Sequence, residues 1–128
     1  MTRAPLTIPG LVEMKARGEQ IVMVTAYDYP SGRLADRAGV DAVLVGDSGA
    51  QVVLGRDSTV AISTDEMIML SGAVRRGVRD ALLVCDVPFG STEISDAQAV
   101  ETAIRFVKEA GADAVKIEGA TPERLSRI

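Results

Sequence analysis

The sequence contains no histidine and no tryptophan, and aromatic residues make up only 3% of it. Histidine is the commonest general base and the commonest transition-metal ligand, so chemistry that depends on it is excluded. Carboxylates, lysine, tyrosine, serine or one thiol must therefore supply any reactive group. A bound metal would be an oxygen-preferring ion such as Mg²⁺. The single cysteine, Cys85, cannot form an intrachain disulfide, and its apolar run "ALLVC" predicts a core position.

Long runs of basic residues and long runs of apolar residues are also missing. The 14 basic and 18 acidic residues give a net charge of −4 with no basic cluster in sequence, which argues against a nucleic-acid partner. No apolar stretch approaches the roughly 20 residues that span a bilayer, and the N-terminus "MTRAPLTIPG" lacks a signal-peptide core. We therefore expect no membrane association, a cytoplasmic location, and one domain over residues 1–128.

What the sequence does contain is a regular alternation. Helix-like segments separate and follow four strand-like runs, "QIVMVTAY", "DAVLVGD", "ALLVCD" and "DAVKIEG". These helices are predicted to begin near Pro30, Ser63, Ser95 and Thr121, with Glu or Gln three residues after both serines, the spacing of a capping box. Such alternation predicts parallel strands joined by right-handed crossovers.

Three further expectations concern the segments around these units. The segment "IPGLVEMKARGEQ" predicts a helix that leads into the first strand, and "GAQVVLGRDSTVAI" a longer loop with a short hairpin. In the third helix, an apolar stripe is formed by Ala97, Val100, Ile104 and Val107. Two architectures fit the whole pattern: a small open sheet of flavodoxin type, or part of a (β/α)₈ barrel, which normally needs about 250 residues.

Three of the strand-like runs end in acidic residues. Asp47 and Ser48 follow the second run, Asp86 ends the third, and the fourth carries Lys116 and Glu118 on one face. In both architectures the carboxyl ends of the strands form the site, so these groups should meet at one rim. Clustered carboxylates repel one another unless a cation or a proton lies among them. The pattern therefore predicts a Mg²⁺ site beside a lysine that stabilises an anionic substrate.

Simpler structural roles compete with this interpretation. Asp47 and Asp86 could equally cap a turn or a helix. Lys116 and Glu118 could equally form an ion pair with a purely structural role. Tyr27 and Asp28, in "TAYDYP", are better explained by a turn that enters the helix at Pro30. Spacing alone does not separate these alternatives.

Five motifs in order resemble one family. "VMVTAYDYPSGRLADRAGVDAVLVGDS", "VVLGRDST", "AVRRG", "DVPFGS" and "EAGADAVKIEG" are similar to the ketopantoate hydroxymethyltransferases, from about Leu11 to Ile128. The resemblance implies the N-terminal half of a TIM-type (β/α)₈ barrel of the phosphoenolpyruvate mutase/isocitrate lyase-like group, with about four βα units. It implies transfer of a hydroxymethyl group from 5,10-methylenetetrahydrofolate to 3-methyl-2-oxobutanoate. The product would be 2-dehydropantoate, in pantothenate and coenzyme A biosynthesis, formed through a Mg-chelated enolate.

The resemblance also implies roles for single residues. Asp47, Asp86 and Glu118 match the family's metal-site positions, and Asp47, Ser48, Asp86 and Lys116 match its substrate contacts. Lys116 and Glu118 are accordingly the candidate catalytic residues. The co-substrates, 3-methyl-2-oxobutanoate and the folate, are the expected partners, together with further copies of the chain in a homo-oligomer.

The chain also departs from the family pattern. The family's general base is a glutamate that would lie beyond Ile128, and the usual "GDSLGMVVLG" is "GDSGAQVVLG" here, which alters Gly49, Ala50 and Gln51. Leu70 replaces a family histidine. An alternative is thus a truncated, non-catalytic homologue that binds metal and keto acid or joins full-length subunits. A sister enzyme for phosphoenolpyruvate-like substrates is less favoured, and a receiver domain least, because Ile117 rather than proline follows Lys116.

Overall fold

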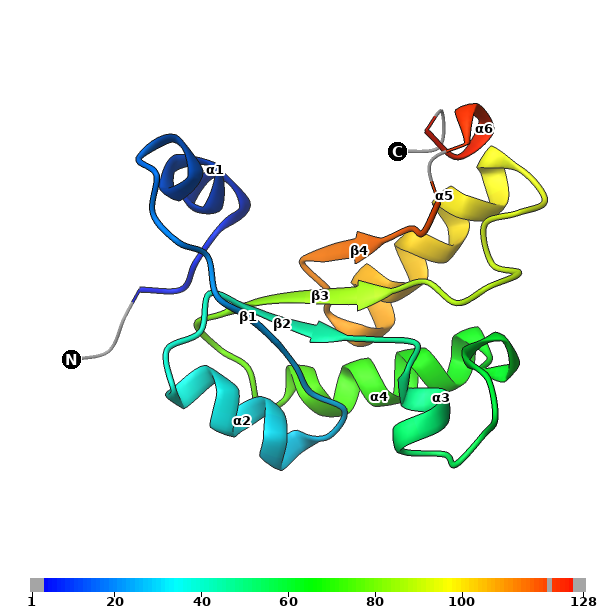
Figure 1. The fold of residues 1–128 in the computed structure, drawn as a ribbon, viewed down its shortest axis with the longest axis horizontal. Helices are drawn as coiled ribbons and strands as arrows, with labels where there is room; N and C mark the ends of the chain where they lie inside the picture. The colour runs from blue at the N-terminus through cyan, green and yellow to red at the C-terminus, as the bar shows by residue number, and fades with distance from the viewer. Residues whose placement is uncertain (1–3, 120, 126–128) are drawn as a thin grey trace.

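Four parallel strands form a single sheet in the order β1-β2-β3-β4, so neighbours in the chain are neighbours in the sheet (Figure 1). The structure, a computed structural model, describes residues 4–119 and 121–125. A flavodoxin-type sheet would place the first strand between the second and third, so the observed order excludes that architecture. Sequential parallel strands are the arrangement of a (β/α) barrel. The strands are β1 (Met23–Thr25), β2 (Ala42–Val45), β3 (Leu82–Asp86) and β4 (Ala114–Lys116).

The helices begin where the capping residues predict. Asp28, Ser63 and Ser95 each accept a hydrogen bond from a backbone N–H in the first turn of the helix that follows. Asp28 and Ser63 form complete capping boxes, so the predicted turn before Pro30 is confirmed. The helical elements are α1 (Ile8–Ala16), α2 (Tyr29–Arg37), α3 (Gly49–Val52), η1 (Thr59–Ala61), α4 (Thr64–Arg75), α5 (Asp96–Arg105), the π-helical turn η2 (Phe106–Ala110) and α6 (Pro122–Leu125).

The predicted elements differ from the observed ones in two places. The first strand covers only Met23–Thr25 of the predicted run. No hairpin forms between residues 49 and 62, where the structure has the short helices α3 and η1. Several apolar side chains of this segment stay exposed, among them Val52 at 66% and Val53 at 48%. The predicted last helix is observed as α6, Pro122–Leu125.

The core lies between the sheet and the helices on one side of it. Val43, Val45, Leu83 and Cys85 point to this side from β2 and β3, and all four are fully buried. They pack in one cluster that includes Met67 and Val74 of α4 and Phe106 of η2. Figure 1 shows α2 and α4 together along this side, with α1 on the other side of the sheet. Alternation along the strands then sends the intervening residues, among them Asp86, to the opposite face.

The apolar stripe along α5 and η2 does not face this core. Val100, Ile104 and Val107 are 55%, 51% and 53% exposed, whereas Ala99, Phe106 and Ala110 are buried. An apolar stripe usually faces a packed surface. Here it lines an open groove of about 910 Å³ whose other wall is β4, with Val115 and Ile117. The groove lies at the sheet edge formed by β4. No helix in the described ranges is both long enough and apolar enough to cross a membrane.

Candidate functional site

The carboxyl ends of β2, β3 and β4 bring the predicted charged residues together. Lys116 Nζ lies 2.8 Å from Asp86 Oδ1 and 2.9 Å from Glu118 Oε1. The backbone N–H of Asp47 donates a hydrogen bond of 3.2 Å to Asp86 Oδ2. The two contacts of Asp86 join residues 30 and 39 positions apart in the chain, and the parallel register of β3 and β4 sets Asp86 beside Lys116.

The electrostatics of this cluster favour a bound cation. Partial burial raises the pKa of Asp47, and the negative charges of Asp86 and Glu118 raise it further against the opposing effect of Lys116. For Lys116, burial acts to lower the pKa, but hydrogen bonds and charge from Asp86 and Glu118 outweigh it and leave the pKa raised. Three carboxylates thus face one ammonium group. The excess negative charge is of the size that a divalent cation would neutralise.

Asp47 and Asp86 are the residues best placed to hold Mg²⁺. Asp86 is buried, and its Oδ1 atom accepts no hydrogen bond of good geometry from the described residues, although Lys116 lies beside it. Mg²⁺ typically takes one or two carboxylates and completes its shell with water and substrate oxygens. Within residues 4–119 and 121–125, no three potential ligands are arranged closely enough for an all-protein metal site. The donor set therefore fits an ion that shares its coordination with a substrate.

Ser48 has a partner that the sequence interpretation missed. The Tyr27 hydroxyl lies 2.8 Å from Ser48 Oγ. Tyr27 was assigned only to the turn before α2, yet it follows the carboxyl end of β1, so the same rule that selected the aspartates would have found it. Ser48 is the N-cap residue of α3, but its side chain makes no capping hydrogen bond. Its hydroxyl is instead fixed by Tyr27 at the rim.

Gly49 allows the tyrosine ring to lie against this loop. A Cβ atom at Gly49 would come within 2.9 Å of Leu70 Cδ1 and 3.3 Å of Tyr27 Cδ1. Leu70 therefore occupies the space that a side chain at position 49 would need. The two departures from the family pattern, at Gly49 and Leu70, therefore lie next to each other.

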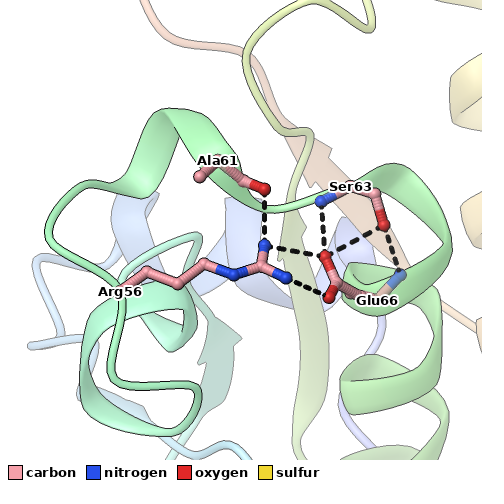
Figure 2. A network of polar contacts seen from close by, with 4 residues as sticks. All are labelled: Arg56, Ala61, Ser63 and Glu66. Carbon is pink, nitrogen blue, oxygen red and sulfur yellow. Dashed lines mark hydrogen bonds and ion pairs between the residues drawn. The ribbon is translucent and has the colours of Figure 1, made fainter.

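An arginine anchors the segment that follows Ser48. Figure 2 shows Arg56 paired with Glu66 of α4 and donating to the Ala61 carbonyl, while Glu66 also accepts from the Ser63 N–H at 2.8 Å. These bonds tie the 49–62 segment to the first turn of α4. Thr59 in this segment lies close enough to Asp47 to oppose the rise in its pKa. A cavity of about 150 Å³ at the rim is lined by Asp47, Thr59, Val60, Val87, Phe89, Thr92, Glu93 and Glu118.

The chain is similar to proteins of one enzyme family. A family model described as ketopantoate hydroxymethyltransferase matches residues 5–128. The 3-methyl-2-oxobutanoate hydroxymethyltransferase of Moorella thermoacetica is 57% identical over 117 residues, which cover 91% of this chain and 44% of that protein. The protein named 3-methyl-2-oxobutanoate hydroxymethyltransferase 1, mitochondrial, of Arabidopsis thaliana is 50% identical over 121 residues, 94% of this chain and 35% of that protein. This chain spans less than half the length of these relatives.

Solved structures share the fold at low sequence identity. Phosphoenolpyruvate phosphomutase from Streptomyces platensis subsp. rosaceus matches with a TM-score of 0.73 and 17% identity, over 95% of this chain and 47% of that one. A 2,3-dimethylmalate lyase of the PEP mutase/isocitrate lyase superfamily matches with a TM-score of 0.67 and 18% identity, over 91% and 41%. The parallel sheet thus corresponds to part of a TIM-type barrel, as the resemblance implied. The matches to the family model and to the curated relatives show that the chain belongs to the ketopantoate hydroxymethyltransferase family.

Proposed function

We propose that this chain supplies the metal and keto-acid half of an active site that transfers a hydroxymethyl group from 5,10-methylenetetrahydrofolate to 3-methyl-2-oxobutanoate. The single observation that supports this most is the convergence of Asp47, Asp86 and Lys116 at one rim, with Lys116 Nζ 2.8 Å from Asp86 Oδ1. The acceptor named in the relatives is a 2-oxo acid, which presents one carboxylate and one neighbouring carbonyl oxygen. That pair of oxygens matches a site with a cation and an ammonium group.

Asp47 and Asp86 would hold Mg²⁺ at the rim, and the 2-oxo acid would complete its coordination. When bound, the metal would polarise the 2-oxo group and make the neighbouring C–H more acidic. Asp47 must be ionised for this role, and burial together with the negative charges of Asp86 and Glu118 raises its pKa and so opposes that ionisation. Metal binding would therefore release part of the repulsion among the three carboxylates.

Lys116 and Ser48 would orient the substrate. Lys116 keeps its positive charge because Asp86 and Glu118 offset the cost of burial, and it would stabilise the negative charge that develops on the substrate oxygen. Glu118 holds Lys116 from the solvent side, since its side chain is 65% exposed. The hydroxyl of Ser48, already positioned by Tyr27, would donate to the keto acid.

The general base and much of the folate site would come from the remainder of the barrel. The groove between α5 and β4 is the surface that the next βα units would cover, because barrel neighbours are added in sequence order. Val100, Ile104 and Val107 would then become buried, which accounts for an apolar stripe on the open side of α5. The site would be complete only with that second half in place.

A complementation assay tests this function. The intact chain is mixed with the C-terminal half of the Moorella thermoacetica relative, and 2-dehydropantoate formation is followed with both substrates and Mg²⁺. We expect turnover only when both halves and Mg²⁺ are present, and none with Asp86→Asn. Keto-acid binding without turnover in the mixture would instead favour the non-catalytic homologue.

A further inference from the structure

A second cleft lies at the opposite end of the sheet from the rim. It has a volume of about 220 Å³ and is lined by Tyr29, Arg33, Asp36, Arg37, Arg76, Gly77 and Arg79. Arg33 and Arg37 belong to α2, whereas Arg76 and Arg79 lie between α4 and β3. Four arginines thus share one small cleft on a chain whose net charge is −4.

The cleft is built by a close backbone contact. A Cβ atom at Gly77 would lie 2.6 Å from the Tyr29 carbonyl oxygen and 2.7 Å from the Arg33 nitrogen. The chain after α4 therefore packs directly on the first turn of α2, and Figure 1 shows these two helices side by side. This contact brings the arginines of the two segments together, although more than 35 residues separate them in sequence.

The arginines of this cleft differ from other arginines of the described residues in their ion pairing. Arg17, Arg56, Arg75 and Arg105 each form an ion pair with a carboxylate. Within the described ranges, none of the four cleft arginines does so. The only carboxylate in the lining is Asp36, whose Oδ1 accepts the backbone N–H groups of Asp80 and Ala81 at 2.9 Å each. Arg33 donates to the Tyr29 hydroxyl at 3.3 Å, which orients one guanidinium toward the cleft.

From this arrangement we propose that the cleft binds a phosphate dianion, either free phosphate or the terminal group of a phosphate monoester. Guanidinium groups match phosphate oxygens in paired hydrogen bonds, and four of them repel one another without an anion between them. The Tyr29 hydroxyl adds a further polar group. The ligand is small, because the cleft is small and rigidly backed by Gly77.

Calorimetric titration of the intact chain with inorganic phosphate, at constant ionic strength, tests the proposal. Arg33→Gln combined with Arg79→Gln removes one arginine from each wall. We expect this variant to lose at least about tenfold in phosphate affinity, since hydrogen bonds to charged groups contribute strongly. Arg17→Gln combined with Arg105→Gln makes the same change of charge outside the cleft and should keep wild-type affinity. Circular dichroism of both variants verifies their folding.

Equal phosphate affinity in the wild type and the cleft variant, or no saturable heat with the wild type, would overturn the proposal. Parallel titration with adenosine 5′-monophosphate separates the two sources of phosphate. Tighter binding of the ester identifies a monoester site, and tighter binding of inorganic phosphate identifies a free-anion site. The test is independent of the proposed function, because Asp47→Asn should leave phosphate binding unchanged and the cleft variant should keep Mg²⁺-dependent binding of the keto acid.

Discussion

Lys116 Nζ lies 2.8 Å from Asp86 Oδ1, so the ammonium group occupies one side of a carboxylate that we propose as a metal ligand. The contact couples the two functions of the rim. The lysine compensates for the buried charge of Asp86, and under the proposed function it would lie beside the metal when the substrate binds. Removing its charge should therefore affect metal and keto acid in opposite directions.

Lys116→Gln should bind Mg²⁺ at least as tightly as the wild type, because a competing positive charge is gone. The same variant should bind 3-methyl-2-oxobutanoate at least about tenfold more weakly, because a charge-assisted hydrogen bond to the substrate is lost. Calorimetric titration with each ligand measures both effects. Lys15→Gln, on the exposed helix α1, is the matched control. Unchanged keto-acid affinity in Lys116→Gln would remove the lysine from the substrate site.

Tyr27→Phe should weaken keto-acid binding by roughly fivefold, corresponding to about 1 kcal/mol for one hydrogen bond. The ring and its contact with Gly49 remain, and only the hydroxyl that positions Ser48 is removed. Tyr29→Phe deletes the other tyrosine hydroxyl, which lines the arginine cleft, and should not change keto-acid affinity. If both variants bind as the wild type does, Tyr27 has no positioning role.

Gly77→Ala should lower the free energy of unfolding by about 1–3 kcal/mol, since the new methyl group meets backbone atoms that have no room to move. Gly72→Ala, inside α4, meets only the flexible end of Arg76 at 3.7 Å and should raise stability by about 0.5–1 kcal/mol through helix propensity. Urea unfolding of both variants measures the difference. A stable Gly77→Ala protein would contradict the close contact between α2 and the chain after α4.

Acid stability should depend on Glu66. The hydrogen bonds from Arg56, with those from Ser63, lower the pKa of Glu66 from 4.5 to about 2. A depressed folded-state pKa contributes stability that is present above about 4.5 and is lost as the pH falls toward about 2. Solvent weakens the contribution, because the two side chains are 32% and 29% exposed. Between these pH values, the free energy of unfolding of Glu66→Gln should vary less with pH than that of the wild type. The same pH dependence of the free energy of unfolding in both proteins would contradict this role of Glu66.

Much of the fold follows from local sequence signals. The caps at Asp28, Ser63 and Ser95 place the helix starts because each side chain satisfies backbone N–H groups that have no partner within the helix. The strand runs place the acids at one rim because parallel strands share their direction. The sequence left open whether the sheet was of flavodoxin or barrel type, since strand order is a long-range property that local patterns do not carry.

Other features depended on contacts that no local pattern encodes. The stripe at Val100, Ile104 and Val107 was visible in sequence, but its exposure depends on what covers the β4 edge. The Tyr27–Ser48 hydrogen bond joins residues 21 positions apart, and the Gly49–Leu70 contact is likewise long-range. The four cleft arginines come from two segments whose approach depends on Gly77. Only the folded chain brings these groups together.

Under the proposed function, Asp47 and Asp86 hold Mg²⁺ for a bound 2-oxo acid. The most direct measurement is calorimetric titration of the intact chain with 3-methyl-2-oxobutanoate, with Mg²⁺ and then with EDTA, in the wild type and in Asp47→Asn and Asp86→Asn. Asp57→Asn, an exposed aspartate in the loop after α3, is the control. We predict saturable binding only with Mg²⁺, abolished in the two rim variants and retained in the control. Binding that persists in EDTA, or is unchanged in both rim variants, would contradict the account.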